Sequence, residues 1–222
     1  MDHEIDVFAD LRRRLTSGEF AYGAKLRADN LRKDYGCAAS TIRETLLRLS
    51  ALGLVEFQEQ RGFRMPGYSL ERQHDMTMMR IMLESEGACL SVQNGGVDWE
   101  SRLTAAHHKL SHIESRMSAL GMVDDLPRLW SEAELEFHQT LISASGSPVL
   151  IELHLNVYNR YRQIKVEADK ELTALADNIK EHQNILDAAI EGDPDLLRRR
   201  IYEHFKRHLK PDASPGVLRL AV

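Results

Sequence analysis

The sequence predicts a mainly α-helical protein in two parts, an N-terminal winged helix-turn-helix and a C-terminal antiparallel bundle of about six helices. Three observations lead to this prediction. Apolar residues recur every three or four positions through most of the chain, which is the spacing of helices that bury one face. Alternation of apolar and polar residues is confined to two short stretches near residues 55–65. Finally, Met65-Pro66-Gly67 interrupts regular structure.

This interruption sets the expected domain organisation. We expect a winged helix-turn-helix domain over residues 1–66, a linker over 67–71, a helical domain over 72–209 and a tail over 210–222. The elements of the first domain follow in order along the chain. An amphipathic helix carries Ile5, Phe8, Leu11 and Leu15. Helices over 28–35 and 40–51 come next, and a hairpin pairs 55–58 with 63–65.

The composition excludes several classes of protein. Hydrophobic residues make up 43% and charged residues 28% of the chain, which is typical of a soluble globular protein. No apolar run approaches the ~20 residues of a membrane helix, and no secretion signal is visible. Cys37 and Cys89 lack metal-like spacing. We therefore expect a cytoplasmic protein that has free thiols and no membrane partner.

The charge is distributed unevenly. The net charge of −5 argues against a nucleic-acid partner, but residues 1–66 hold 11 Lys/Arg against 10 Asp/Glu. Residues 67–222 hold 18 Lys/Arg against 24 Asp/Glu. The basic excess is therefore local, as expected of a docking face on an acidic protein.

The N-terminal residues resemble the GntR family DNA-binding domain over about residues 5–66. The segments that carry the resemblance are Gly18–Leu26, Leu31–Cys37, Thr41–Leu46, Leu49–Val55 and Arg61-Gly62. The resemblance implies that the third helix enters the major groove and that the hairpin forms a wing beside it. The family usually has Ser-Arg before the recognition helix, whereas this chain has Ala38-Ala39, so we expect specificity to depend more on Arg43 and the wing.

Different residues are expected to contact different parts of the DNA. Arg43 can bind guanine through two hydrogen bonds, and Ser40 and Thr41 can reach bases or phosphates. Other basic residues are placed for backbone contacts, and glycine lets the wing approach the minor groove. The alternative is that these charged residues form an exposed face that contacts only solvent. The predicted DNA-binding residues are Arg32, Lys33, Ser40, Thr41, Arg43, Arg48, Arg61 and Gly62.

The pattern of the second domain predicts helices joined by short loops, so we expect neighbouring helices to run antiparallel. We place Met76, Met79, Leu83 and Leu90 on the inner face of its first helix, as core residues. The predicted helices are 70–93, 98–119, 124–144, 147–168, 171–191 and 194–209.

The histidines are the informative polar residues of this domain. His107 and His108 are adjacent and are expected at the surface. Glu134 and His138 share one helical face at i and i+4, while His182 and His204 lie near the inner faces of their helices. Three imidazoles and a carboxylate would suit a divalent transition metal, provided that they converge. The alternative is a polar, hydrogen-bonded bundle core.

The same region resembles the FCD effector domain, the FadR-type C-terminal domain of the GntR family, over about residues 72–209. Its motifs are Arg80…Glu84, Glu134–His138, Glu181–Ile190 and Tyr202–His204. The resemblance implies a metal site at Glu134, His138, His182 and His204, although Glu134 stands where the family has Asp. The metal could be zinc, nickel or manganese.

The FCD resemblance also implies a small carboxylate effector. Arg80 matches the family's anchoring arginine, and its alternative role is a salt bridge to Glu84. Tyr158 and Arg162 are further candidates for lining the effector pocket.

We therefore expect a homodimeric, ligand-responsive regulator that binds a palindromic operator in double-stranded DNA. One alternative is a DNA-binding dimer whose helical domain no longer senses a ligand. A metal-dependent hydrolase is less favoured, because the sequence shows no nucleophile motif and no phosphate loop.

Overall fold

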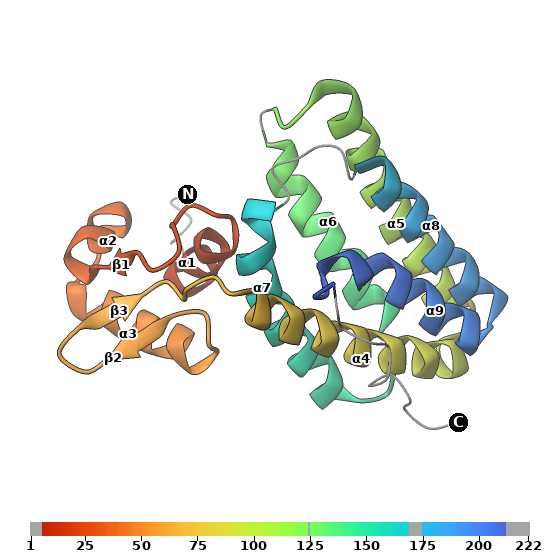
Figure 1. Cartoon of the computed structure of the whole chain (residues 1–222), viewed down its shortest axis with the longest axis horizontal. Coiled ribbons are helices and arrows are strands. Elements are labelled where there is room, and N and C mark those ends of the chain that lie inside the picture. The colour runs from red at the N-terminus through yellow and green to blue at the C-terminus, as the bar shows by residue number, and fades with distance from the viewer. Residues whose placement is uncertain (1–5, 124, 169–174, 212–222) are drawn as a thin grey trace. The chain divides into compact units, whose positions relative to one another are not determined.

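The computed structural model describes residues 6–123, 125–168 and 175–211 (Figure 1). Contacts divide the chain into two compact units, Met1–Tyr68 with Asn156–Glu171 and Ser69–Leu155 with Leu172–Val222. Parts of our predictions lie outside the described residues: Ile5, the helix starts at 124 and 171, and the tail from 212 onward. None of the described helices is both long and apolar enough to cross a membrane.

The first unit contains a three-helix core and a small sheet, which confirms the predicted fold class. Its helices are α1 (Val7–Thr16), α2 (Ala28–Tyr35) and α3 (Ala39–Ala51). Its strands are β1 (Lys25–Leu26), β2 (Glu56–Gln58) and β3 (Gly62–Arg64), arranged antiparallel in the order β1-β3-β2. We did not predict β1, because a strand of two residues is too short to show alternation.

Helix α3 is held by its apolar face. Ile42, Leu46 and Leu49 are fully buried and pack with Leu11 and Leu15 of α1. Burying each such side chain contributes roughly 1.5–3 kcal/mol, so this face fixes the orientation of α3 and leaves the opposite face in solvent.

Local signals set the turns of this unit. Gly36 ends α2 in the left-handed region, with φ of 62°, and so permits the tight turn into α3. Gly62 has φ of 77° at the start of β3, directly after the hairpin turn, a conformation that L side chains rarely adopt. Ala38, the N-cap of α3, has no side chain to accept a hydrogen bond from the first turn.

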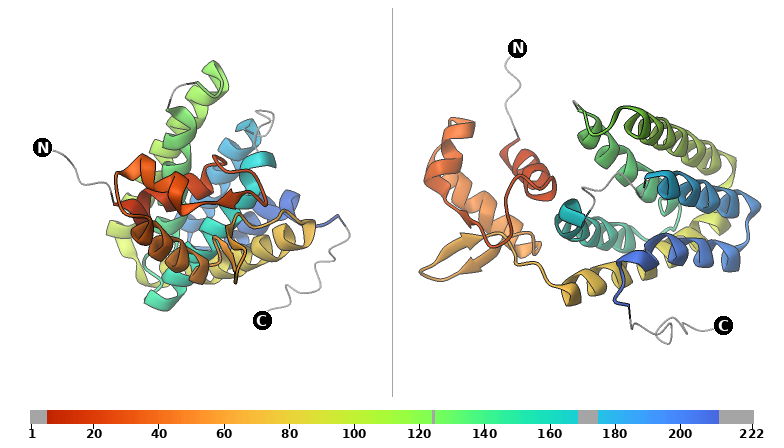
Figure 2. Two further views of the ribbon diagram at one scale, coloured as in Figure 1. Left: turned by 90° about the vertical axis from the view of Figure 1, so that its left-hand side faces the viewer. Right: turned by 45° about the horizontal axis from the view of Figure 1, so that its top comes forward.

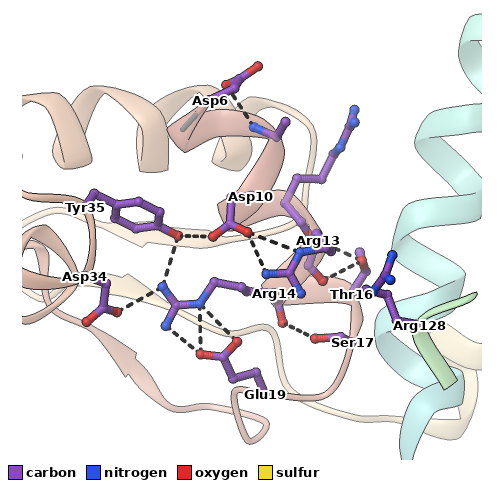
Figure 3. A network of polar contacts seen from close by, with 12 residues as sticks. Asp6, Asp10, Arg13, Arg14, Thr16, Ser17, Glu19, Asp34, Tyr35 and Arg128 are labelled. Carbon is purple, nitrogen blue, oxygen red and sulfur yellow. Dashed lines mark hydrogen bonds and ion pairs between the residues drawn. The ribbon is translucent and has the colours of Figure 1, made fainter. Parts of the chain in front are cut away.

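A polar network ties α1 to α2 (Figure 3). Tyr35 Oη donates to Asp10 Oδ2 at 2.8 Å and accepts from Arg14 Nη1 at 3.0 Å. Arg14 also pairs with Glu19 and Asp34, at 2.8 Å and 2.9 Å. Burial raises the pKa of Asp10, but its bonds to Arg13 and Tyr35 outweigh burial and lower it below the usual range. Burial raises the pKa of Tyr35 to about 12.

The second unit is a helical bundle. Its helices are α4 (Leu70–Asn94), α5 (Gly96–Leu120), α6 (Leu126–Leu141), α8 (Leu175–Glu191) and α9 (Pro194–Phe205), followed by the 3-10 helix Lys206–His208. Helix α5 packs against α6 and α8, and α9 packs against α8 and α4 (Figure 2). Helix α7 (Pro148–Ala168) contributes its first turns to this unit and residues from Asn156 onward to the first.

The predicted inner face of α4 is wrong. Met79 is 40% exposed, and Met76, Leu83 and Leu90 are only partly buried. The buried face instead carries mostly polar side chains, because it lines a polar cluster in the bundle interior. Its residues include Thr77, Arg80, Ile81, Glu84 and Ser85.

Candidate functional site

Three histidines from three helices meet inside the bundle. His138 comes from α6, His182 from α8 and His204 from α9, and each is at most 2% exposed. One ring nitrogen from each lies within 4.8 Å of the others. The ring of Phe137 packs edge-on against His138 and His182, with centroid distances of 5.3 Å to each. The convergence that sequence spacing could not establish is therefore present.

A carboxylate lies beside the Nδ1 atom of each histidine. Glu84 Oε2 is 2.8 Å from Nδ1 of His138, and Glu114 Oε1 is 3.2 Å from Nδ1 of His182. Glu181 Oε2 is 2.9 Å from Nδ1 of His204. Glu84 and Glu114 are fully buried, whereas the Glu181 side chain is 24% exposed.

Burial sets the protonation of the site. It lowers the pKa of His138 to about 4, although Glu84 opposes the shift, so the ring is neutral near pH 7 and can act as a ligand. Burial raises the pKa of Glu84, but Arg80 and His138 outweigh it and hold that pKa well below the usual range. Burial also raises the pKa of Glu181, although the positive charge of Arg207 opposes the shift.

These residues fit a divalent cation. Among the described residues, both ring nitrogens of His138 and both of His182 have no hydrogen-bond partner, although all four atoms are buried. Buried polar atoms normally find partners, and imidazole nitrogens are common ligands of zinc, nickel and manganese. The surrounding carboxylates favour a positive ion at this position.

Glu134 is buried but lies outside the three-histidine group. Its Oε1 is 4.0 Å from Nε2 of His138 and 3.6 Å from Nη1 of Arg80. The role of Glu134 as a metal ligand therefore stays a prediction.

Arg80 is buried beside the histidines. Its Nε donates to Glu84 Oε1 at 2.7 Å, and its guanidinium lies 4.4 Å from the centroid of the Phe205 ring. The salt bridge considered as an alternative is thus present, and both partners are fully buried. Tyr158 and Arg162 are also buried, in the part of α7 that belongs to the first unit. The effector contacts of all three residues stay predictions.

Two buried residues near the three histidines, His107 and Glu114, were not predicted from the sequence. His107 was expected at the surface, but it is buried and packs its ring 5.8 Å from that of Phe137, while His108 is exposed. The missed signal is its neighbour Ala106, which lies on the apolar stripe of α5. Glu114 lies on the same stripe, between Leu110 and Met117, and an acid in that position indicates a buried role.

The predicted DNA-binding residues lie at the surface of the first unit. Ser40, Thr41 and Arg43 are exposed on α3, and within the described part of the chain Arg43 has no acidic partner within 4.0 Å. The Arg48 guanidinium lies 4.4 Å from the centroid of the Phe8 ring, so this side chain also packs on α1. The remaining candidates are exposed, except for the half-buried glycine; they are Arg32, Lys33, Arg61 and Gly62.

Two family models match the chain. The model for bacterial regulatory proteins of the gntR family matches residues 5–65, and the FCD domain model matches residues 75–207. Both describe transcriptional regulators, and no catalytic family is indicated.

Individual relatives that align over most of the chain are also described as transcriptional regulators. The HTH-type transcriptional regulator BphR of Paraburkholderia xenovorans is 32% identical, covering 96% of this chain and 86% of the relative. The HTH-type transcriptional repressor GlaR of Escherichia coli is 26% identical, covering 90% and 91%. The solved structure of McbR/YncC from E. coli has the same fold, with a TM-score of 0.75 and 21% identity over 90% of this chain and 92% of that one.

Proposed function

The chain belongs to the gntR family of bacterial regulatory proteins and carries an FCD domain, and we propose that its helical unit senses a small organic acid through a bound divalent metal. Transcriptional regulation and DNA binding follow from the family. The single observation that supports metal-dependent sensing is the buried convergence of His138, His182 and His204.

Each part of the proposed sensor has a defined chemical role. The three histidines would hold the metal through ring nitrogens, with Glu134 as a further ligand. When bound, the metal supplies a Lewis acid that attracts a carboxylate group. Arg80 adds a fixed cation for the same group, and its position is held by Glu84 at 2.7 Å. Tyr158 and Arg162 are proposed as further contacts to the effector.

We propose that the regulator works as a homodimer on a palindromic operator. Several apolar side chains are exposed on the described helices, including Met79 of α4 and Val149 and Leu153 of α7, and they offer area for association. Arg43, Ser40 and Thr41 would read base edges, and Arg61 and Gly62 would meet the minor groove. The effector can shift DNA binding only through its different affinities for two states of the dimer.

The test starts with DNA, because the operator is not needed in advance. Duplexes that bind the full chain are selected from a random library, and their affinity is then measured by fluorescence anisotropy. Small carboxylates are screened by thermal shift on the zinc-loaded protein, and those that raise its melting temperature are added to the DNA titration. We expect a palindromic consensus and an affinity that changes with the carboxylate. A consensus without symmetry would argue against the dimer, and no carboxylate effect would argue against the sensor.

A second candidate is a regulator whose helical unit only dimerises. It is favoured by one observation: Glu134, which replaces the family's Asp, lies outside the histidine group and pairs with Arg80. This candidate predicts no metal content and no melting shift with any carboxylate, whereas DNA binding is intact.

A further inference from the structure

The three carboxylates at the histidines form a set. Glu84 of α4, Glu114 of α5 and Glu181 of α8 each lie 2.8–3.2 Å from the Nδ1 atom of a different histidine. The Glu181–His204 contact has hydrogen-bond geometry, whereas the contacts of Glu84 and Glu114 are within hydrogen-bonding distance but are not aligned as hydrogen bonds. We propose that they are positioning residues, each fixing one imidazole so that its Nε2 faces the metal. The inference rests on the proposed metal site and identifies the residues that hold its histidine ligands in position.

The chemistry follows from the donor inventory of the two groups. A neutral imidazole has one N–H donor and one nitrogen with a free electron pair, and an ionised carboxylate can only accept. A carboxylate beside Nδ1 therefore holds the proton on Nδ1 and leaves the electron pair on Nε2. The same contact restricts rotation of the ring and increases the basicity of the ligating nitrogen. Glu181 already makes this bond to His204, and we propose that Glu84 and Glu114, at 2.8 Å and 3.2 Å from Nδ1 of their histidines, make it when the metal orients the rings.

Glu114 is the clearest member of the set. It is fully buried, and its Oε1 also accepts a hydrogen bond from Nε1 of Trp130 at 3.2 Å. In the described part of the chain, neither Lys nor Arg lies within 4.0 Å of its carboxylate. Burying a carboxylate without a cation is costly, and a divalent ion on the far side of the His182 ring supplies the missing positive charge.

The other two carboxylates have additional partners. Glu84 Oε1 contacts Arg80 at 2.7 Å and His154 Nε2 at 2.9 Å, and Glu181 pairs with Arg207. Removing either one therefore disturbs structure as well as ligand position. Glu114 separates the two effects best, because its carboxylate accepts a hydrogen bond from Trp130 and otherwise lies 3.2 Å from Nδ1 of His182.

The test is the affinity for Zn²⁺ of the full chain carrying Glu114→Gln, measured by competition with a chromophoric chelator. Gln keeps the shape of Glu and still accepts the Trp130 bond, but it carries no charge. We expect zinc affinity to fall by about 10- to 100-fold, while the metal-free protein melts near the wild-type temperature. The control is Glu136→Gln, which removes an exposed carboxylate on α6 and leaves zinc affinity unchanged.

A second readout reports the position of the ring itself. Two-bond ¹H–¹⁵N spectra distinguish the two neutral tautomers of a histidine. The wild type is expected to show the Nδ1–H tautomer at His182, and Glu114→Gln is expected to show a mixture. Should Glu114→Gln not fold, Glu181→Gln takes its place, since that side chain is partly exposed.

The outcomes separate this inference from the proposed function. Wild type that binds no Zn²⁺ overturns the metal site and the inference with it. Wild type that binds Zn²⁺, together with Glu114→Gln of equal affinity and unchanged tautomer, overturns the positioning role alone.

Discussion

The stability cost of removing the buried Glu84 carboxylate can be measured against a control, because α4 also carries an exposed glutamate, Glu86. Glu84→Ala removes a fully buried carboxylate that lies 2.7 Å from Arg80, which is equally buried. Removing one partner of a buried pair costs about 3–5 kcal/mol, because the other charge loses its compensation. Glu86 pairs with Arg198 at 3.0 Å, with side chains 56% and 44% exposed, and Glu86→Ala should cost less than about 1 kcal/mol.

The assay uses the two tryptophans of the chain. Trp99 and Trp130 are both buried in the second unit, so their fluorescence follows the unfolding of that unit. Urea and thermal unfolding are measured in EDTA, so that metal does not contribute. At roughly 2–8 °C per kcal/mol, Glu84→Ala should lower the melting temperature by at least about 6 °C. The reasoning is refuted if Glu84→Ala and Glu86→Ala destabilise the protein equally.

Three further predictions concern the first unit. Ala38→Ser supplies the missing N-cap of α3 and should stabilise the protein by about 0.5–2 kcal/mol in urea unfolding. No gain in stability would show that the first turn of α3 does not need a side-chain cap. Arg43→Ala should weaken binding to a selected duplex by about 1–3 kcal/mol with little change in stability, and equal affinity would remove Arg43 from the interface. Tyr35→Phe should cost about 1–2 kcal/mol at pH 7, because it loses the bond to charged Asp10. The pKa of Asp10 is lowered by folding, so this contribution is present above about pH 4 and is lost as the pH falls further; a pH-independent difference would contradict it.

The helices could be predicted because their apolar spacing is local information. Leu11 and Leu15, or Ile42, Leu46 and Leu49, carry the periodicity that the core then uses. The same logic failed on α4, where apolar Met79 is exposed and charged Arg80 is buried. Periodicity assumes that the interior is apolar, and the assumption fails where the interior is a polar site.

The site was predictable only in part. His138, His182 and His204 were identified from their residue type, their place on inner faces and a family resemblance, and their convergence needed the packing of three helices. Glu114 and Glu181 carry no spacing that relates them to a histidine on another helix, since 68 positions separate Glu114 from His182. Such pairs are set by tertiary packing, which a single sequence does not display.

The central claim is that the three histidines hold a metal, and metal analysis tests it most directly. Wild type and His182→Ala are purified, incubated with zinc, nickel or manganese, desalted and measured by mass spectrometry. The account predicts about one ion per wild-type chain and its loss in the variant. No metal in either protein, after incubation with any of the three ions, would contradict it.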